Sequence, residues 1–263
     1  MKIVSYKERA KFYDVEYLPL DDTKFLMHFL NNKNVSNILE IPCGSGFHLT
    51  FFFAFKDKHF HLMDKENRMI FLLKEKLKRL GNPSNISCSI GEFGKLKSKK
   101  KYDLIIVPQE SFQLILSKNE ALRTLNCFFK HLSDNGKLII DLASFDEKSI
   151  NVYSCPVYYS ISHYGDKIHY NWQKGLANGN TLIRKSSCRK KNDTIWLTFY
   201  YLEIGDKTSK FKSELKLKIY SKINFAQLSQ MSGFKVHQLY GNYNLDLYKR
   251  HDPRLIWILK KDS

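Results

Sequence analysis

The chain of 263 residues contains few cysteines and no long apolar run. Its five cysteines are odd in number, widely spaced and without a CxxC pair, which argues against a disulfide framework and a structural zinc site. The longest apolar run, Phe47–Phe55, is interrupted twice and is far shorter than the ~20 residues of a membrane-spanning helix. The first residues show no signal-peptide pattern. These absences predict a cytoplasmic protein without a membrane partner.

Arginine is also scarce, although the chain is strongly basic. With 43 Lys and Arg against 26 Asp and Glu, the formal net charge is +17, as in many nucleic-acid-binding proteins. Only eight of these residues are arginines, the type that phosphate clamps and base-edge contacts favour. An AT-rich genome also encodes much lysine and asparagine at surface positions that are under no functional constraint. The charge leaves RNA binding and compositional bias both open.

Hydrophobic residues make up 43% of the chain and aromatics 14%, enough for a large folded core. Up to residue 145, short apolar segments alternate with segments of helical period, which predicts a Rossmann-like, doubly wound parallel sheet. The expected strands are 37–42, 59–64, 86–90, 102–107 and 137–142, and the expected helices are 5–18, 22–30, 66–80, 118–132 and one beginning near 47.

The pattern changes to a period of two between about 155 and 220, with turn signals between the segments. The expected strands are 156–163, 167–173, 181–188, 194–203 and 214–220. A helix after Ser221 and strands 234–240 and 255–259 close the chain, which raises the parallel sheet to seven strands. We therefore expect an antiparallel β insertion, 146–220, within one α/β domain formed by 36–145 and 221–263. A free edge of this insertion is a possible homodimer interface.

The segment from Glu40 to Gly46 joins a strand to a helix and contains two glycines. In nucleotide-binding sheets this is where the backbone approaches the ligand closely. Asp64 ends the next strand, where a carboxylate can accept both ribose hydroxyls. A dinucleotide would require a third glycine, but Leu49 occupies that position, so a ligand without phosphates fits better.

These motifs together resemble the class I S-adenosylmethionine-dependent methyltransferases. The likeness rests on Ile38–Gly46, Asp64, Glu92-Phe93, Tyr102–Val107 and Gly136–Leu142. It implies S-adenosyl-L-methionine as cofactor, with Gly44 and Gly46 beside its methionine part, which Glu40 orders, and Asp64 on its ribose. Glu92 and Phe93 would meet the adenine. The remaining residues expected at the cofactor are Pro42, Lys65, Met69 and Pro108; Pro42 stands where many members have glycine, and Glu92 where many have aspartate.

A narrower resemblance points to small-molecule N-methyltransferases such as glycine N-methyltransferase and the amino-sugar N,N-dimethyltransferases. It rests on Lys11–Asp14, Ser111-Phe112, the β insertion and Tyr240–Tyr243. This likeness implies an N-terminal helical lid, 1–35, and an acceptor site beneath the insertion. Tyr13 would lie over the sulfonium. The expected acceptor contacts are Tyr17, Ser111, Phe112, Tyr240 and Asn242, and Gln109 and Glu110 leave the fourth strand as candidate catalytic residues.

Three functions remain open from the sequence. The first is methyl transfer to a nitrogen, or less readily an oxygen, of a small-molecule acceptor. The second is an RNA or RNA-cap methyltransferase that uses the basic surface, and the third is a catalytically silent binding subunit. No metal is expected, because the alternating pair His59 and His61 has no third ligand at suitable spacing.

Overall fold

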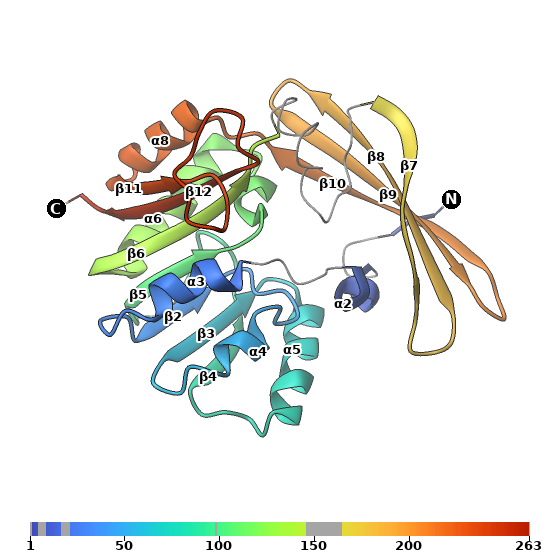
Figure 1. Ribbon diagram of the computed structural model, residues 1–263, viewed down its shortest axis with the longest axis horizontal. Coiled ribbons are helices and arrows are strands. Elements are labelled where there is room, and N and C mark those ends of the chain that lie inside the picture. Colours follow the sequence, from blue (N-terminus) through green and yellow to red (C-terminus); the bar gives the residue numbers. More distant parts are fainter. Residues whose placement is uncertain (1, 5–8, 17–21, 98, 146–164, 263) are drawn as a thin grey trace.

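The computed structural model describes residues 2–4, 9–16, 22–97, 99–145 and 165–262, and its elements form two sheets with a short helix between them (Figure 1). The larger sheet has seven strands in the order β11-β12-β6-β5-β2-β3-β4. All neighbouring pairs are parallel except those of β12, which runs antiparallel to β6 and β11. The expected Rossmann-like sheet is confirmed. Its strands are β2 (Asn37–Glu40), β3 (His59–Asp64), β4 (Ile86–Ile90), β5 (Tyr102–Val107), β6 (Leu132–Ala143), β11 (Phe234–Tyr240) and β12 (Arg254–Lys261).

Helices cover both faces of this sheet, because successive strand residues point to opposite sides and both sides are apolar. Leu39 and Ile105 pack with α6 and α8, whereas Ile38 and Ile106 pack with α3, α4 and α5. The chain therefore buries near-continuous apolar strands, as the sequence pattern predicts. The helices are α3 (Thr23–Leu30), α4 (Leu49–Phe52), α5 (Asn67–Arg79), α6 (Lys118–His131) and α8 (Lys222–Met231).

Two local expectations need correction. Residues 133–136, between the expected helix 118–132 and the expected strand 137–142, lie within β6, whose pairing with β5 begins at Leu132 and is interrupted by a shift in register before Lys137. The Ser133 hydroxyl donates to Asp103 across this irregularity, which keeps the chain beside β5. The helix after the glycine loop, α4, contains only four residues and ends in a turn.

The second sheet has the order β1-β10-β9-β8-β7, antiparallel except for the β1–β10 pair, and confirms the expected β insertion. Phe12 stacks on Phe211 of this sheet, with ring centroids 5.5 Å apart. The 156–163 strand lies outside the described residues, and β10 begins before the expected residue 214. The strands are β1 (Lys2–Ile3), β7 (Gly165–Gly175), β8 (Thr181–Lys191), β9 (Thr194–Ile204) and β10 (Ser209–Lys218).

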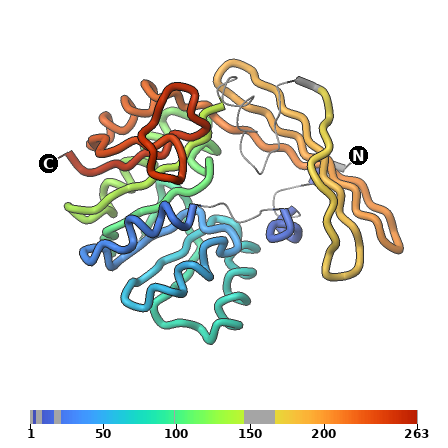
Figure 2. The backbone as a smooth tube through the Cα atoms, in the orientation of Figure 1, coloured from blue at the N-terminus to red at the C-terminus, as the bar shows by residue number. Residues whose placement is uncertain are grey.

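The described part of the N-terminal segment forms η1 (Ala10–Phe12) and α2 (Tyr13–Glu16). The tube view shows α2 between the two sheets, apart from the helices that cover the seven-stranded sheet (Figure 2). Among the described helices, none is long and apolar enough to cross a membrane.

Candidate active site

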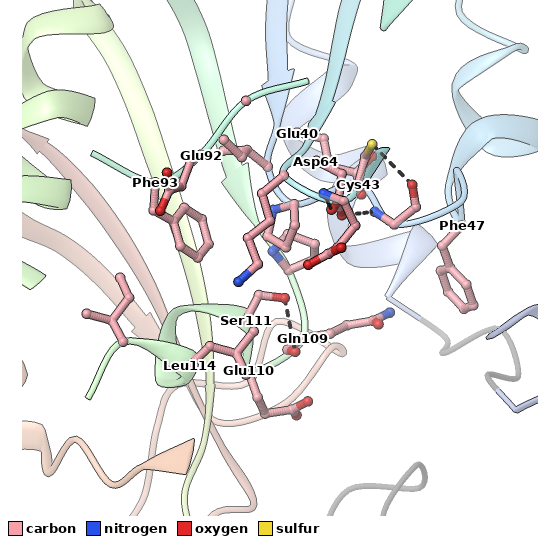
Figure 3. Close-up of a pocket in the computed structure, with 18 of the residues that line it drawn as sticks. Glu40, Cys43, Phe47, Asp64, Glu92, Phe93, Gln109, Glu110, Ser111 and Leu114 are labelled. Carbon is pink, nitrogen blue, oxygen red and sulfur yellow. Dashed lines mark hydrogen bonds between the residues drawn. The ribbon is translucent and has the colours of Figure 1, made fainter. Parts of the chain in front are cut away.

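A cavity of about 270 Å³ opens at the carboxyl ends of β2, β3 and β5, where ligands bind in open α/β sheets. Glu40 and Asp64 lie on one side of it and Gln109, Glu110 and Ser111 on the other (Figure 3). Residues of α2 and β10 complete the wall. The lining residues are Tyr13, Glu40, Ile41, Pro42, Cys43, Gly44, Phe47, His48, Asp64, Lys65, Glu66, Gly91, Glu92, Phe93, Pro108, Gln109, Glu110, Ser111, Leu114, Ile115, Glu120, Glu214, Leu215 and Leu217.

Asp64 holds the glycine loop against the end of β3. Its Oδ2 accepts the backbone N–H of Gly44 at 2.9 Å, and its Oδ1 accepts that of Glu66 at 2.8 Å. Burial raises the pKa of this carboxyl, while the two backbone donors act in the opposite direction. Each carboxylate oxygen has about two lone pairs, so both oxygens retain acceptor capacity on the cavity side.

The ring of Tyr13 lies directly over Gly44. A β-carbon built on Gly44 would be 2.6 Å from the Tyr13 hydroxyl oxygen, and Gly44 has a φ of +54°, which non-glycine residues rarely adopt. Beside this contact, the Ser45 hydroxyl donates to Asp14, and Lys76 donates to the same carboxylate at 2.9 Å. Helix α2 is thereby bound to the glycine loop.

The other side of α2 is bound to the β insertion through buried charges. Arg9 forms a buried ion pair with Glu16, and Arg184 of β8 lies 3.7 Å from the same carboxylate. The Arg9 guanidinium also stacks 4.4 Å from the ring centroid of Phe199, and Lys174 donates to the carbonyl of Val15. Residues 9–16 therefore connect the insertion to the cavity.

On the glycine-loop side, His48 lies between two buried carboxylates. Its Nδ1 is 2.6 Å from Glu40 Oε1, and its Nε2 is 3.0 Å from Asp22 Oδ2. The two carboxylates raise the pKa of His48 to about 10, against the opposing effect of burial, while burial raises the pKa of Glu40. Among the described residues, Glu40 Oε2 is buried without a hydrogen-bond partner.

On the opposite side, Arg254 lies between Glu110 and Asp141. Its Nε donates to Asp141 Oδ1 at 2.7 Å and its Nη2 donates to Glu110 Oε1. The Tyr243 hydroxyl donates to the second oxygen of Asp141 at 2.7 Å. Burial raises the pKa of Glu110 to about 7, outweighing the positive charge of Arg254. Its Oε2 is buried and has no partner among the described groups.

Gln109 connects the two buried networks. Its backbone N–H donates to Asp141 at 3.3 Å and its side-chain amide donates to Asp22 at 3.4 Å. Gln109 and Glu110 have φ values of +51° and +56°, a left-handed conformation that is costly for non-glycine residues. The hydrogen bonds and the buried ion pair stabilise this turn, which directs the chain along the cavity wall.

The third part of the wall is less buried. Glu92 forms an ion pair with Lys95 at 2.8 Å, which lowers the pKa of Glu92. Phe93 lines the cavity and packs edge-on against Phe128, with ring centroids 6.1 Å apart. A flat apolar ring next to a carboxylate suits a planar heterocycle that carries an amino group.

A model of the methyltransferase domain family matches residues 32–204, which is more than half of the chain. The chain belongs to the methyltransferases.

Solved structures agree in fold with this methyltransferase. A S-adenosylmethionine-dependent methyltransferase from Clostridium acetobutylicum superposes with a TM-score of 0.77 over 98% of this chain and 99% of that one, at 15% identity. The S-adenosylmethionine-bound amino pentose methyltransferase CalS10 from Micromonospora echinaspora gives 0.71 over 100% and 99%, at 12% identity.

A curated relative shares part of the sequence. The malonyl-[acyl-carrier protein] O-methyltransferase 2 of Ilyobacter polytropus is 30% identical over 130 residues, 48% of this chain and 48% of that protein. The chain thus spans about half the length of the curated relative it matches.

S-adenosyl-L-methionine is the cofactor of this methyltransferase. The buried carboxylates suit this cofactor. The unpartnered Oε2 of Glu40 can accept a hydrogen bond from its ammonium group, and Asp64 can accept hydrogen bonds from two hydroxyls. The close approach of Gly44 to the cavity leaves the loop free of side-chain bulk. Among the described residues, no group of three or more His, Cys, Asp or Glu is placed to hold a metal ion.

The structure brings most of the sequence-predicted residues to one cavity and places others elsewhere. Gly46 faces Leu73, and Met69 is buried in α5, so neither lines the cavity. Phe112 is fully buried in the core, and Tyr17 lies outside the described residues. Two further residues lie away from the lining, Tyr240 at the end of β11 and Asn242 in the following turn. The predicted residues in the lining are Tyr13, Glu40, Pro42, Gly44, Asp64, Lys65, Glu92, Phe93, Pro108, Gln109, Glu110 and Ser111.

The residues that hold Glu110 were not predicted from the sequence. Asp141 interrupts the apolar run of β6, and a charged residue inside a buried strand requires a partner. That signal was available, but it does not identify Arg254 or Tyr243, which are more than 100 residues later in the chain.

Proposed function

We propose that the methyltransferase transfers the methyl group to a nitrogen of a small-molecule amine. The observation that carries this proposal is the buried, unpartnered Oε2 of Glu110, a residue that lines the cavity on the side opposite Glu40 and Asp64. A protonated amine has no lone pair with which to attack a methyl group. A carboxylate beside it can take that proton, and burial keeps the Glu110 pKa near 7, suitable for a base at neutral pH.

The charge of the cavity supports a cationic or neutral acceptor. Glu40, Asp64 and Glu110 are buried carboxylates, and Glu92 and Glu214 add exposed ones in a protein whose net charge is +17. An anionic acceptor, such as the carboxyl group that an O-methyltransferase esterifies, would be repelled by this wall. Comparable folds include an amino pentose methyltransferase and a sugar N-methyltransferase, which fits an amine on a sugar-sized skeleton.

The positions of the lining side chains support a proposed role for each of them. When bound, S-adenosylmethionine supplies a methyl group already activated by its sulfonium. Glu40 would hold the ammonium group of the cofactor, Asp64 the ribose, and Glu92 with Phe93 the adenine. Tyr13 closes the cavity above Gly44 and excludes water, and Glu110 accepts the proton of the acceptor amine.

We further propose that three parts of the chain share this work. Residues 36–145 and 221–263 bind the cofactor, residues 146–220 cover the acceptor, and residues 1–35 form the lid. The contacts of α2 with both the glycine loop and β8 support this division.

The test is a methyl-transfer assay with matched acceptors, in which each sugar-sized primary amine is paired with the hydroxyl and carboxyl compounds of the same skeleton. Release of S-adenosylhomocysteine is the readout. We expect turnover with the amines only. Turnover confined to the carboxyl or hydroxyl compounds would overturn the assignment of nitrogen as the acceptor atom.

A further inference from the structure

His48 is a buried histidine to which the proposed reaction assigns no role. It is 1% exposed, and its two ring nitrogens face Glu40, at the end of β2, and Asp22, at the start of α3. These two acidic residues are themselves 1% and 4% exposed. The three side chains therefore form one buried unit from three separate parts of the chain, and two of them, Glu40 and His48, line the cavity.

The two carboxyl groups that flank His48 determine its charge. Against the opposing effect of burial, they raise the pKa of His48 to about 10, so at neutral pH each ring nitrogen carries a proton and donates to its partner. The ring is then an imidazolium, and with both carboxyl groups ionised the unit has a net charge of −1. Other titratable groups that interact with this unit are Cys43, close to Glu40, and Glu110 and Tyr243, which lie near Asp22. None of the three supplies a second positive charge.

Glu40 uses only one of its oxygens in this unit. Its Oε1 is bonded to His48, while its buried Oε2 has no partner within the described part of the chain. We propose that His48 is a positioning residue for the cofactor: its imidazolium keeps Glu40 ionised and turns Oε2 toward the ammonium group of S-adenosylmethionine. His48 cannot serve as a base, because both of its nitrogens are already protonated and bonded.

This role predicts how the affinity for the cofactor depends on pH. Burial alone raises the pKa of Glu40, and the nearby imidazolium counteracts that rise. Without the imidazolium, Glu40 takes up a proton at higher pH and then attracts the ammonium group less. The contribution of Glu40 to cofactor binding consequently becomes more strongly dependent on pH when His48 is removed.

The test is calorimetric binding of S-adenosylhomocysteine, which carries the same ammonium group, to the full chain. Between about pH 6 and about pH 8 we expect the wild-type affinity to change by less than about threefold, because the His48 imidazolium opposes protonation of Glu40. For His48→Gln we expect weaker binding that falls by up to about tenfold for each pH unit below the new Glu40 pKa, since one proton is taken up.

His61→Gln is the matched control. His61 is half-buried on β3, and its ring nitrogens lie 2.7 Å from the hydroxyls of Tyr102 and Ser89, which are neutral partners away from the cavity. Its variant should bind with the wild-type affinity and pH dependence. A loss in His48→Gln by the same factor at every pH would show a merely structural role and overturn the proposal.

Two further measurements identify the titrating group. The double variant H48Q/E40Q should bind weakly at every pH, and a persistent pH dependence there would assign the titration to another group and overturn the proposal. If the H48Q variants do not fold, nitrogen NMR of the wild-type protein decides instead. A doubly protonated His48 ring at about pH 8 supports the proposal, whereas a neutral ring overturns it. Failure of the wild-type protein to bind at all would instead contradict the cofactor assignment.

Discussion

The carboxylate of Glu110 accepts a hydrogen bond from the guanidinium of Arg254, a residue 144 positions later in the chain. The same guanidinium donates to Asp141, so one buried cation is shared by two buried carboxylates. The orientation of the candidate base is consequently determined by Arg254, the first residue of β12, as well as by its own loop.

Replacing Arg254 by methionine should destabilise the protein strongly. Removing one partner of a buried ion pair leaves uncompensated charge and typically costs about 3–5 kcal/mol. Chemical denaturation of the variant should show this loss in the free energy of unfolding. The matched control is Arg250→Met, because Arg250 is exposed, and its variant should stay within about 0.5 kcal/mol of the wild-type protein.

Replacing Glu110 by glutamine should lower kcat by about 10²–10⁴-fold, as expected for loss of a general base. For the wild-type protein, kcat/KM should rise about tenfold per pH unit up to the Glu110 pKa of about 7 and then level off, because only the ionised carboxylate accepts a proton. The variant should lack this acid limb. Glu75→Gln, on the exposed side of α5, is the control and should retain it; an unchanged acid limb in Glu110→Gln would assign the base to another residue.

Replacing Gly44 by alanine should weaken binding of S-adenosylhomocysteine. The added methyl group meets the Tyr13 hydroxyl at 2.6 Å, and the φ of +54° is strained for alanine. If a strain of about 1–3 kcal/mol is relieved only by moving the loop, the affinity for S-adenosylhomocysteine falls roughly 5- to 150-fold. Adding Tyr13→Ala should recover part of the loss by removing the clash, and calorimetry of both variants tests this. No recovery would show that backbone strain alone is responsible.

Replacing Asp64 by alanine should abolish most cofactor binding. The variant loses the acceptor proposed for the ribose hydroxyls and also the bonds that hold Gly44 and Glu66. Hydrogen bonds to a charged group contribute about 1.5–3 kcal/mol each, so a loss of at least a hundredfold is expected for the pair of hydroxyls. Asp134→Ala, at an almost fully exposed side chain, is the control. Wild-type affinity in the Asp64 variant would refute the ribose assignment.

The fold could be predicted from the sequence because its signals are local. The strands Asn37–Glu40 and Tyr102–Val107 contain the consecutive apolar residues Ile38-Leu39 and Leu104–Val107, which is typical of parallel strands covered on both faces. The loop containing Gly44 and the carboxylate of Asp64 follow directly from their places at strand ends, and both line the cavity.

The buried networks could not be predicted, because no local pattern reports a partner that is distant in the sequence. Asp22 precedes α3, where an aspartate is typical of a helix cap, yet it makes no side-chain cap bond and instead faces His48. Phe112 is the reverse example, a residue expected in the site that lies in the core. Its neighbour Ser111 lines the cavity, but the Phe112 ring packs against Phe225 in the core.

The contacts of α2 have a consequence for the order of folding. Lys174 bonds the carbonyl of Val15 across 159 positions, and Arg9 stacks on Phe199. A ribosome releases the N-terminal segment first, but its partners emerge only after most of the chain has been made. Contacts of such long sequence separation form slowly. The cavity is therefore completed late in synthesis, and a nascent chain can form much of the parallel sheet before α2 is bound beside the cavity.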